Sequence, residues 1–222
     1  MPKLKPETQS ARREHILDAA ETCFAQAGFH RTTMHDICKM AGVSPGALYV
    51  YFDSKEALIA GLTERDRIEF AERFALVVEA SDFLAALRDL GDYYMHPDRS
   101  LKARLGIEIG LEATRNPRIG EIYKRFDCEV RENFERLFRR LEAEGLIAPT
   151  LDIPTLANAV CLIADGMFWR HAVGTDSASS PAAPTLPLAF ALIESLLNPT
   201  TLADKAKPAT TDPVTSVTDK VP

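Results

Sequence analysis

Hydroxyl and ammonium groups that could hold phosphate oxygens gather in residues 29–58 of this sequence. Tyr49 and Tyr51 supply hydroxyls and Lys55 supplies an ammonium, which are common phosphate contacts in proteins that bind nucleic acid. Val50, between the tyrosines, offers an apolar surface of the kind that packs on thymine methyl groups. The candidate contact residues are Thr33, Ser44, Pro45, Gly46, Ala47, Tyr49, Val50, Tyr51 and Lys55. Their chemistry favours contact with double-stranded DNA.

The first of two short helices that must position these groups is marked at both ends. Thr33 and Asp36 have the spacing of a capping box, in which a hydroxyl and a carboxylate satisfy free backbone amides. Gly42 lies where a residue in the left-handed conformation would end the helix. The sequence therefore predicts a helix over about 33–40, followed by a tight turn.

The second short helix combines good start signals with a residue that weakens it. Ser44 is a favoured N-cap and Pro45 a favoured first residue, which predicts a helix over about 44–51. Gly46 costs this helix about 0.5–1 kcal/mol relative to alanine. Its small size allows close backbone approach, and the N-terminal end of a recognition helix is the end that meets base edges. The two helices are interpreted as a helix-turn-helix at about 33–52.

Lys55 is the most informative charge of the segment. The next helix is expected over about 54–80, with Asp53 and Glu56 at a spacing that suits an N-cap. Lys55 then falls in the first turn, where the helix dipole disfavours a cation. A phosphate there would stabilise both the lysine and the free amides. Thr33, at the start of the preceding helix, is placed to hold a phosphate in the same way. The alternative is a compact helical hairpin with exposed tyrosines.

The segment FHRTTMHDICKMAGVSPGALYVYFDSKEAL resembles the TetR (tetracycline-repressor) family of bacterial regulators. The resemblance rests on its Thr-Thr pair, Asp-Ile, Ala-Gly-Val-Ser, Leu-Tyr, Tyr-Phe and Lys-Glu-Ala-Leu, and the upstream ILDAAETCFAQAGF is similar to the family's first helix. Cys38 stands where the family often has alanine, but it is small and expected to be buried. The resemblance implies an all-α fold, with a three-helix DNA-binding domain at 9–56 and a larger helical domain at 57–198.

The resemblance also implies roles for the contact residues. The family's phosphate contacts fall on Thr33, Tyr49, Tyr51 and Lys55, and its base-reading positions on Pro45, Gly46, Ala47 and Val50. Arg12, or the basic arm at Lys3 and Lys5, would add backbone or minor-groove contacts. A solvated charged terminus is the simpler interpretation of these last three residues.

Apolar residues at helical spacing predict about nine helices and no sheet, because no stretch shows sustained alternation rich in β-branched residues. The expected helices are 8–28, 33–40, 44–51, 54–80, 82–96, 101–115, 117–145, 153–173 and 185–197. The segment 199–222 has four prolines, six threonines and no aromatic residue, so a disordered tail is expected there.

The larger domain is expected to bind an effector and to dimerise, as the resemblance implies. The family usually dimerises through its last two helices, here 153–173 and 185–197, although these could instead complete the core of a monomer. A hydrophobic small-molecule effector is expected among the helices between 82 and 171. The candidate liners are Tyr93, Tyr94, Glu108, Glu112, Tyr123, Phe126, Asp165, Phe168, Trp169 and His171, each of which could also be core or solvated surface.

Composition and motifs exclude several other classes. The net charge of −6 lies wholly beyond residue 56, because seven basic and seven acidic residues balance up to that point, so it does not exclude DNA binding. The four cysteines are scattered, so no metal, cofactor or redox site is predicted. No apolar run approaches the roughly 20 residues of a membrane span, and no secretory signal is recognised, so a cytoplasmic location is expected.

An enzyme is not expected, because no nucleophile, metalloprotease or phosphate-loop motif is present. The favoured hypothesis is a homodimeric repressor that binds a palindromic DNA operator and is released by a small-molecule effector. The alternative is a helical protein that binds a ligand or partner and no longer reads DNA.

Overall fold

The computed structural model describes residues 6–174 and 185–200, and this part of the chain contains nine α-helices, one short 3-10 helix and no strand. The helices are α1 Pro6–Ala27, α2 Met34–Ala41, α3 Pro45–Tyr49, α4 Lys55–Glu79, α5 Phe83–Met95, η1 Pro97–Arg99, α6 Ser100–Ala113, α7 Pro117–Ala143, α8 Ile153–Val173 and α9 Thr185–Leu197. The predicted all-α fold is confirmed, and each α-helix lies within two residues of its predicted bounds. Apolar periodicity does not reveal η1, because three residues are too few to show a period.

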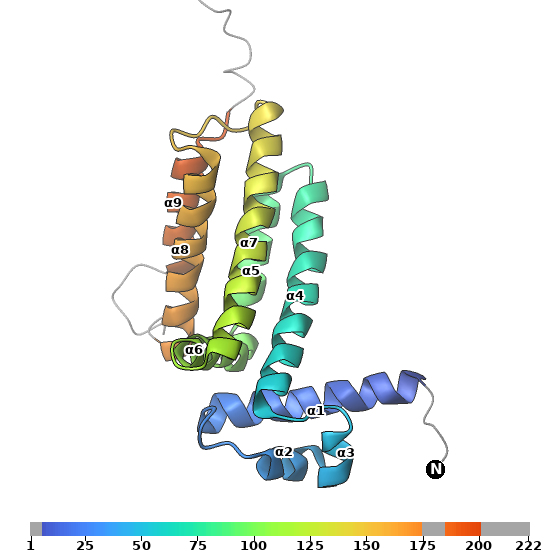
Figure 1. The fold of residues 1–222 in the computed structure, drawn as a ribbon. Coiled ribbons are helices and arrows are strands. Elements are labelled where there is room, and N and C mark those ends of the chain that lie inside the picture. The colour runs from blue at the N-terminus through green and yellow to red at the C-terminus, as the bar shows by residue number, and fades with distance from the viewer. Residues whose placement is uncertain (1–5, 175–184, 201–222) are drawn as a thin grey trace, which may run out of the picture.

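Helices α1, α2 and α3 form one end of the molecule, and α4 runs from that end along the bundle of the remaining helices (Figure 1). Helices α5, α7, α8 and α9 make up most of that bundle. Helix α6 crosses its end and lies beside α1. The two helices that join the small end to the bundle are therefore α4 and α6.

The start of α4 differs from the prediction by one residue. Ser54, and not Asp53, is its N-cap, because the Ser54 Oγ accepts a hydrogen bond from the Ala57 N–H at 3.1 Å. The Asp53 carboxylate instead accepts a hydrogen bond from the Ser54 hydroxyl at 2.9 Å. A hydroxyl and a carboxylate are both good N-caps, so adjacent candidates leave the choice to the tertiary fold.

Two apolar cores follow one another along α4. The first packs α1, α2 and α3 around the start of α4, and it also takes in Leu105 and Ile109 of α6 and Ile119 of α7. The second packs the far half of α4 against α5, α7, α8 and α9. The first core thus extends beyond the expected domain boundary at 56/57, and α6 belongs partly to the small end.

The expected tail at 199–222 begins with two residues that are bound to the rest of the chain. Pro199 forms an isolated antiparallel bridge with Ile147, and the Thr200 N–H donates to the Leu146 carbonyl at 3.0 Å. The Thr200 hydroxyl also donates to the Gly145 carbonyl at 2.5 Å. Residues 201–222, on which the prediction of disorder rests, lie outside the described residues. None of the described helices has the length and apolar character that crossing a membrane requires.

Candidate DNA-binding surface and effector region

The turn between α2 and α3 has the hydrogen bonds that the sequence predicts. The Thr33 hydroxyl accepts from the Asp36 N–H at 3.2 Å, while the Asp36 carboxylate accepts from the Thr33 N–H at 2.9 Å. Gly42 has φ 62°, a left-handed conformation that favours glycine. The Ser44 Oγ accepts from the Ala47 N–H at 3.2 Å and so caps α3. These local bonds fix the angle at which α3 leaves α2.

Helix α3 divides into a buried side and a bare outer side. Leu48 is fully buried and Phe52, just beyond the helix, is 4% exposed, as their spacing predicts. Tyr49 is 54% exposed and Val50 is 78% exposed. A methyl group added at Gly46 would meet no atom within 4 Å, so the N-terminal turn of α3 is open on that side. The exposed residues are therefore free to contact a partner.

The remaining predicted phosphate contacts differ in exposure. Thr33 is exposed, but its hydroxyl also donates to the Asp36 carboxylate at 2.6 Å within the capping box. Tyr51 is half-buried and packs against the first core. Arg12 of α1 is exposed, whereas Lys3 and Lys5 lie outside the described residues.

Lys55 is held by the turn that precedes α2. Its Nζ donates to the carbonyls of Phe29 at 2.5 Å and Thr32 at 2.9 Å. The ammonium also lies over the Phe29 ring, 4.3 Å from the ring centroid. These contacts offset the unfavourable helix dipole, so a phosphate is not needed to explain a lysine at this position.

Two family models match separate parts of the chain. The model of bacterial regulatory proteins of the tetR family matches residues 16–62, which include α2 and α3. The model of the C-terminal domain of BetI-type transcriptional repressors matches residues 84–198, about half of the chain. This chain belongs to the TetR family. Its helix-turn-helix is thus the family's DNA-reading element, and the chain is a DNA-binding transcriptional regulator.

Individual relatives agree with this membership. The regulator UidR of Escherichia coli (strain K12) is 32% identical over 152 residues, which cover 68% of this chain and 76% of UidR. The repressor AcnR of Corynebacterium diphtheriae is 31% identical over 182 residues, covering 80% of this chain and 90% of AcnR. The solved structure of Salmonella enterica GusR superposes with a TM-score of 0.70 at 27% identity, covering 88% of this chain and 99% of GusR.

In this TetR-family protein, we expect Lys55→Met to lower the free energy of unfolding by about 1–3 kcal/mol, because two carbonyls lose a charged donor while the apolar stem is kept. Urea denaturation measures the change, and Lys124→Met, at an exposed lysine of α7, is the control. If Lys55 also contacts a DNA phosphate, the substitution would in addition weaken DNA binding. The slope of log affinity against log salt concentration would then fall by about one unit. Unchanged stability would contradict the structural role.

The predicted effector residues lie at several separate places on the described helices. Tyr94 and Phe168 lie together, with ring centroids 5.9 Å apart. Phe126 lines a groove of about 230 Å³ between α4 and α7. Trp169 lies on an outer face of α8 and is 59% exposed. Tyr123 and Asp165 are exposed, Tyr93 and His171 are half-buried, and Glu108 and Glu112 face the small end.

The two glutamates of α6 hold the turn between α1 and α2. The Glu108 carboxylate accepts a hydrogen bond from the Phe29 N–H at 3.3 Å and lies against Gly28, which has φ 82°. Glu112 pairs with His30 at 2.8 Å, and its side chain is only 6% exposed. The pair of carboxylates spaced four apart thus joins the bundle to the DNA-reading end, and the sequence showed only that they share a helix face.

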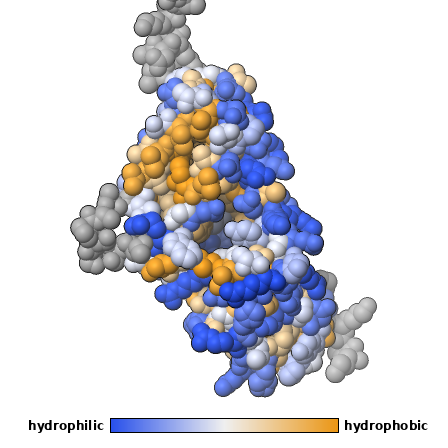
Figure 2. All heavy atoms as spheres, turned by 60° about the vertical axis from the view of Figure 1, so that its left-hand side comes forward, coloured by the Kyte–Doolittle hydropathy of each residue, from blue (hydrophilic) through white to orange (hydrophobic). Residues whose placement is uncertain are grey.

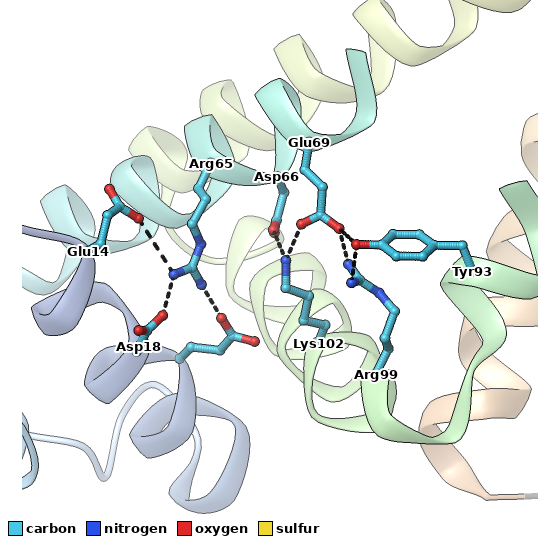
Figure 3. A network of polar contacts seen from close by, with 9 residues as sticks. Glu14, Asp18, Arg65, Asp66, Glu69, Tyr93, Arg99 and Lys102 are labelled. Atoms are coloured by element: carbon cyan, nitrogen blue, oxygen red, sulfur yellow. Dashed lines mark hydrogen bonds and ion pairs between the residues drawn. The ribbon is translucent and has the colours of Figure 1, made fainter. Parts of the chain in front are cut away.

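A network of charged side chains joins α4 to its neighbours on two sides (Figure 3). Arg65 of α4 pairs with Glu21 and with Asp18, the latter at 2.7 Å, and both belong to α1. On the other side, Lys102 of α6 pairs with Asp66 at 2.9 Å and with Glu69 at 2.6 Å, both of α4. Helix α4 is therefore held by ion pairs to both the small end and the bundle.

Arg99 and Tyr93 complete this network at Glu69. Arg99 pairs with Glu69 and donates to the Tyr93 Oη at 2.6 Å, while the Tyr93 hydroxyl donates to Glu69 at 2.5 Å. Burial alone would raise the pKa of Glu69, but hydrogen bonds from Lys102 and Tyr93 and the nearby cations outweigh it and lower the pKa to about 2. The charged form thus stabilises the fold above the ordinary value of 4.5, and this contribution is lost as the pH falls toward 2.

Glu21, at the other end of the network, responds in the opposite direction. Its side chain is buried, and this burial raises its pKa although the charges of Arg65 and Lys102 oppose the shift. The sequence did not reveal these residues as a group, because their helices are far apart along the chain.

Proposed function

We propose that this chain is a homodimeric repressor that binds a palindromic operator and leaves it when a small-molecule effector binds. The observation that carries the proposal is the combination of an exposed α3 with a bare apolar face on α8 and α9, at the other side of the molecule. The first surface suits DNA, and the second suits a copy of the chain.

The dimer face consists of exposed apolar side chains at helical spacing on the last two helices (Figure 2). Leu162, Trp169 and Val173 of α8 share this face with Leu188 and Leu192 of α9. Gly166 lies exposed between the α8 residues, and a methyl group added there would meet no atom within 4 Å. Monomeric proteins rarely expose a contiguous apolar face of this kind, whereas four-helix dimer interfaces need one.

A two-fold symmetric dimer explains why the operator is expected to be palindromic. Each protomer contributes one α3, and the two helices enter successive major grooves about 34–36 Å apart. The glutamates of α6 and the ion pairs of α4 connect the bundle to the small end, so a ligand that prefers another arrangement of these helices weakens DNA binding by linkage. The four cysteines are free thiols, which supports a reducing cytoplasm as the place of action.

Selection of bound DNA from a random duplex library tests the proposal with the full chain. We expect an enriched inverted repeat whose half-sites are centred about 10 base pairs, or a multiple of that, apart. An enriched single half-site would contradict the dimer, and no enrichment from folded protein would favour a helical protein that no longer reads DNA.

A further inference from the structure

Buried polar atoms without a hydrogen-bond partner gather around Tyr94. The described residues contain six such side-chain atoms, and four of them are the Tyr94 Oη, the Nε atoms of Arg73 and Arg99, and the His171 Nε2. Each buried unsatisfied group costs about 1–3 kcal/mol, and native proteins satisfy nearly all of them. A concentration of such atoms in one place is therefore a reason to expect a ligand there.

These four groups come from different helices, and three of them, on Arg73, Tyr94 and Arg99, meet at the rings of Tyr93 and Tyr94. The Arg99 guanidinium carbon is 5.3 Å from the Tyr94 ring centroid and 4.1 Å from that of Tyr93. The Arg73 guanidinium carbon lies 3.0 Å from the Tyr93 centroid, and the two tyrosine rings are 5.2 Å apart. His171 is on the same face of α8 as Phe168, one turn away, because residues three apart are neighbours on a helix.

The charge at this place favours an anion. The guanidinium groups of Arg73 and Arg99 contact the rings of Tyr93 and Tyr94. Among the described residues, Glu69 is the one carboxylate that forms an ion pair with either arginine. Arg73 forms no ion pair in that part of the chain. Burial raises the pKa of the Tyr94 phenol, so its hydroxyl stays protonated and able to donate. Donors thus outnumber acceptors here.

Aromatic side chains border the same place. The rings of Phe70 and Phe168 lie 6.4 Å and 5.9 Å from that of Tyr94. Phe70 also lines the groove of about 230 Å³ between α4 and α7, where apolar and charged side chains alternate. The other lining residues are Arg67, Ala71, Phe126, Glu129, Val130, Asn133 and Arg136. An apolar body next to an anionic head would match these surroundings.

We propose that the effector is an organic anion whose carboxylate or phosphate accepts hydrogen bonds from Tyr94, Arg99 and Arg73, with its apolar part against Phe70 and Phe168. The inference rests on the proposed function in one respect, namely that a small molecule controls the repressor. The anion competes with Glu69 for Arg99, and so it weakens a contact that joins α4 to η1.

Calorimetric titration of the full-length protein tests the site with defined probes. The anions are benzoate, hexanoate and phenyl phosphate, and the neutral counterparts are benzamide, hexanamide and phenol. We expect at least one anion to bind more than about tenfold tighter than its neutral counterpart. Tyr94→Phe and Arg73→Gln should each weaken that binding about tenfold. The controls Tyr123→Phe and Arg118→Gln, at exposed side chains outside the cluster and the groove, should change it less than about twofold.

Each result decides between clear alternatives. Equal binding of anions and neutral compounds, no binding of any probe, or equal effects of the cluster and control variants would overturn the anion site. The carboxylate and phosphate arms show which head group the site prefers. Retention on the selected operator is measured separately. Binding that depends on Tyr94 without release from DNA would leave the site standing and contradict the effector-release part of the proposed function. Operator binding by a protein that binds none of the anions would contradict the anion site and leave the proposed DNA-binding function standing.

Discussion

The double substitution Leu162→Glu, Trp169→Glu leaves the protein monomeric and lowers its affinity for the selected operator by about a hundredfold or more, because a dimer gains that much from binding two half-sites at once. Leu162 is 63% exposed and Trp169 is 59% exposed on the bare face of α8, so glutamates there disturb no packing within the protomer. In a dimer, the same positions would bury four uncompensated carboxylates, each at a cost of several kcal/mol.

Sedimentation equilibrium and a gel-shift titration measure the two effects. The matched control is Ile68→Glu, Leu76→Glu, which charges two exposed apolar residues of α4 and should leave a dimer with unchanged affinity. A double variant of α8 that remains dimeric at micromolar concentration would rule out this face as the interface.

Gly46→Glu should reduce operator affinity by about a hundredfold or more, because a carboxylate at the N-terminal turn of α3 meets the negative potential of the DNA. The side chain has room in the free protein, since nothing lies within 4 Å of a Cβ at this position. The melting temperature should therefore change little, which separates loss of DNA contact from loss of fold.

Gly46→Ala makes the same test without charge. It should stabilise the fold by about 0.5–1 kcal/mol, because alanine is the better helix residue, and yet weaken DNA binding if the backbone of α3 approaches the bases closely. Gly106→Ala in α6, another glycine with open space around it, should give the gain in stability alone. Unchanged DNA binding by both Gly46 variants would place the base contacts elsewhere.

The helices and their ends could be predicted because the signals are local. Thr33 with Asp36, and Ser44 with Pro45, lie within a turn of the backbone groups they satisfy, so their types and spacing suffice. The buried side of α3 also followed from spacing alone, since Leu48 and Phe52 lie four residues apart and both are buried.

The contacts of the charged residues could not be predicted, because they depend on how helices meet. The carbonyl partners of Lys55 come 26 and 23 residues before it, and the amide partner of Glu108 lies 79 residues before it. Trp169 was expected at a pocket, yet its helix is rich in apolar residues on more than one side. Periodicity therefore did not show which side faces inward.

Helix α4 supplies Leu58, Ile59 and Leu62 to the first core and Phe74 and Val77 to the second. Unfolding of α4 would therefore remove packing from both cores. The two halves of a protomer are thus expected to unfold as one cooperative unit. A small molecule bound only in the bundle would then raise the melting temperature reported by a probe placed on α2 or α3. A ligand at a hundred times its Kd adds about 2.7 kcal/mol to the folded state. Ligand binding in the bundle is therefore expected to stabilise the DNA-binding end against unfolding, even when the ligand leaves the angle of α3 unchanged.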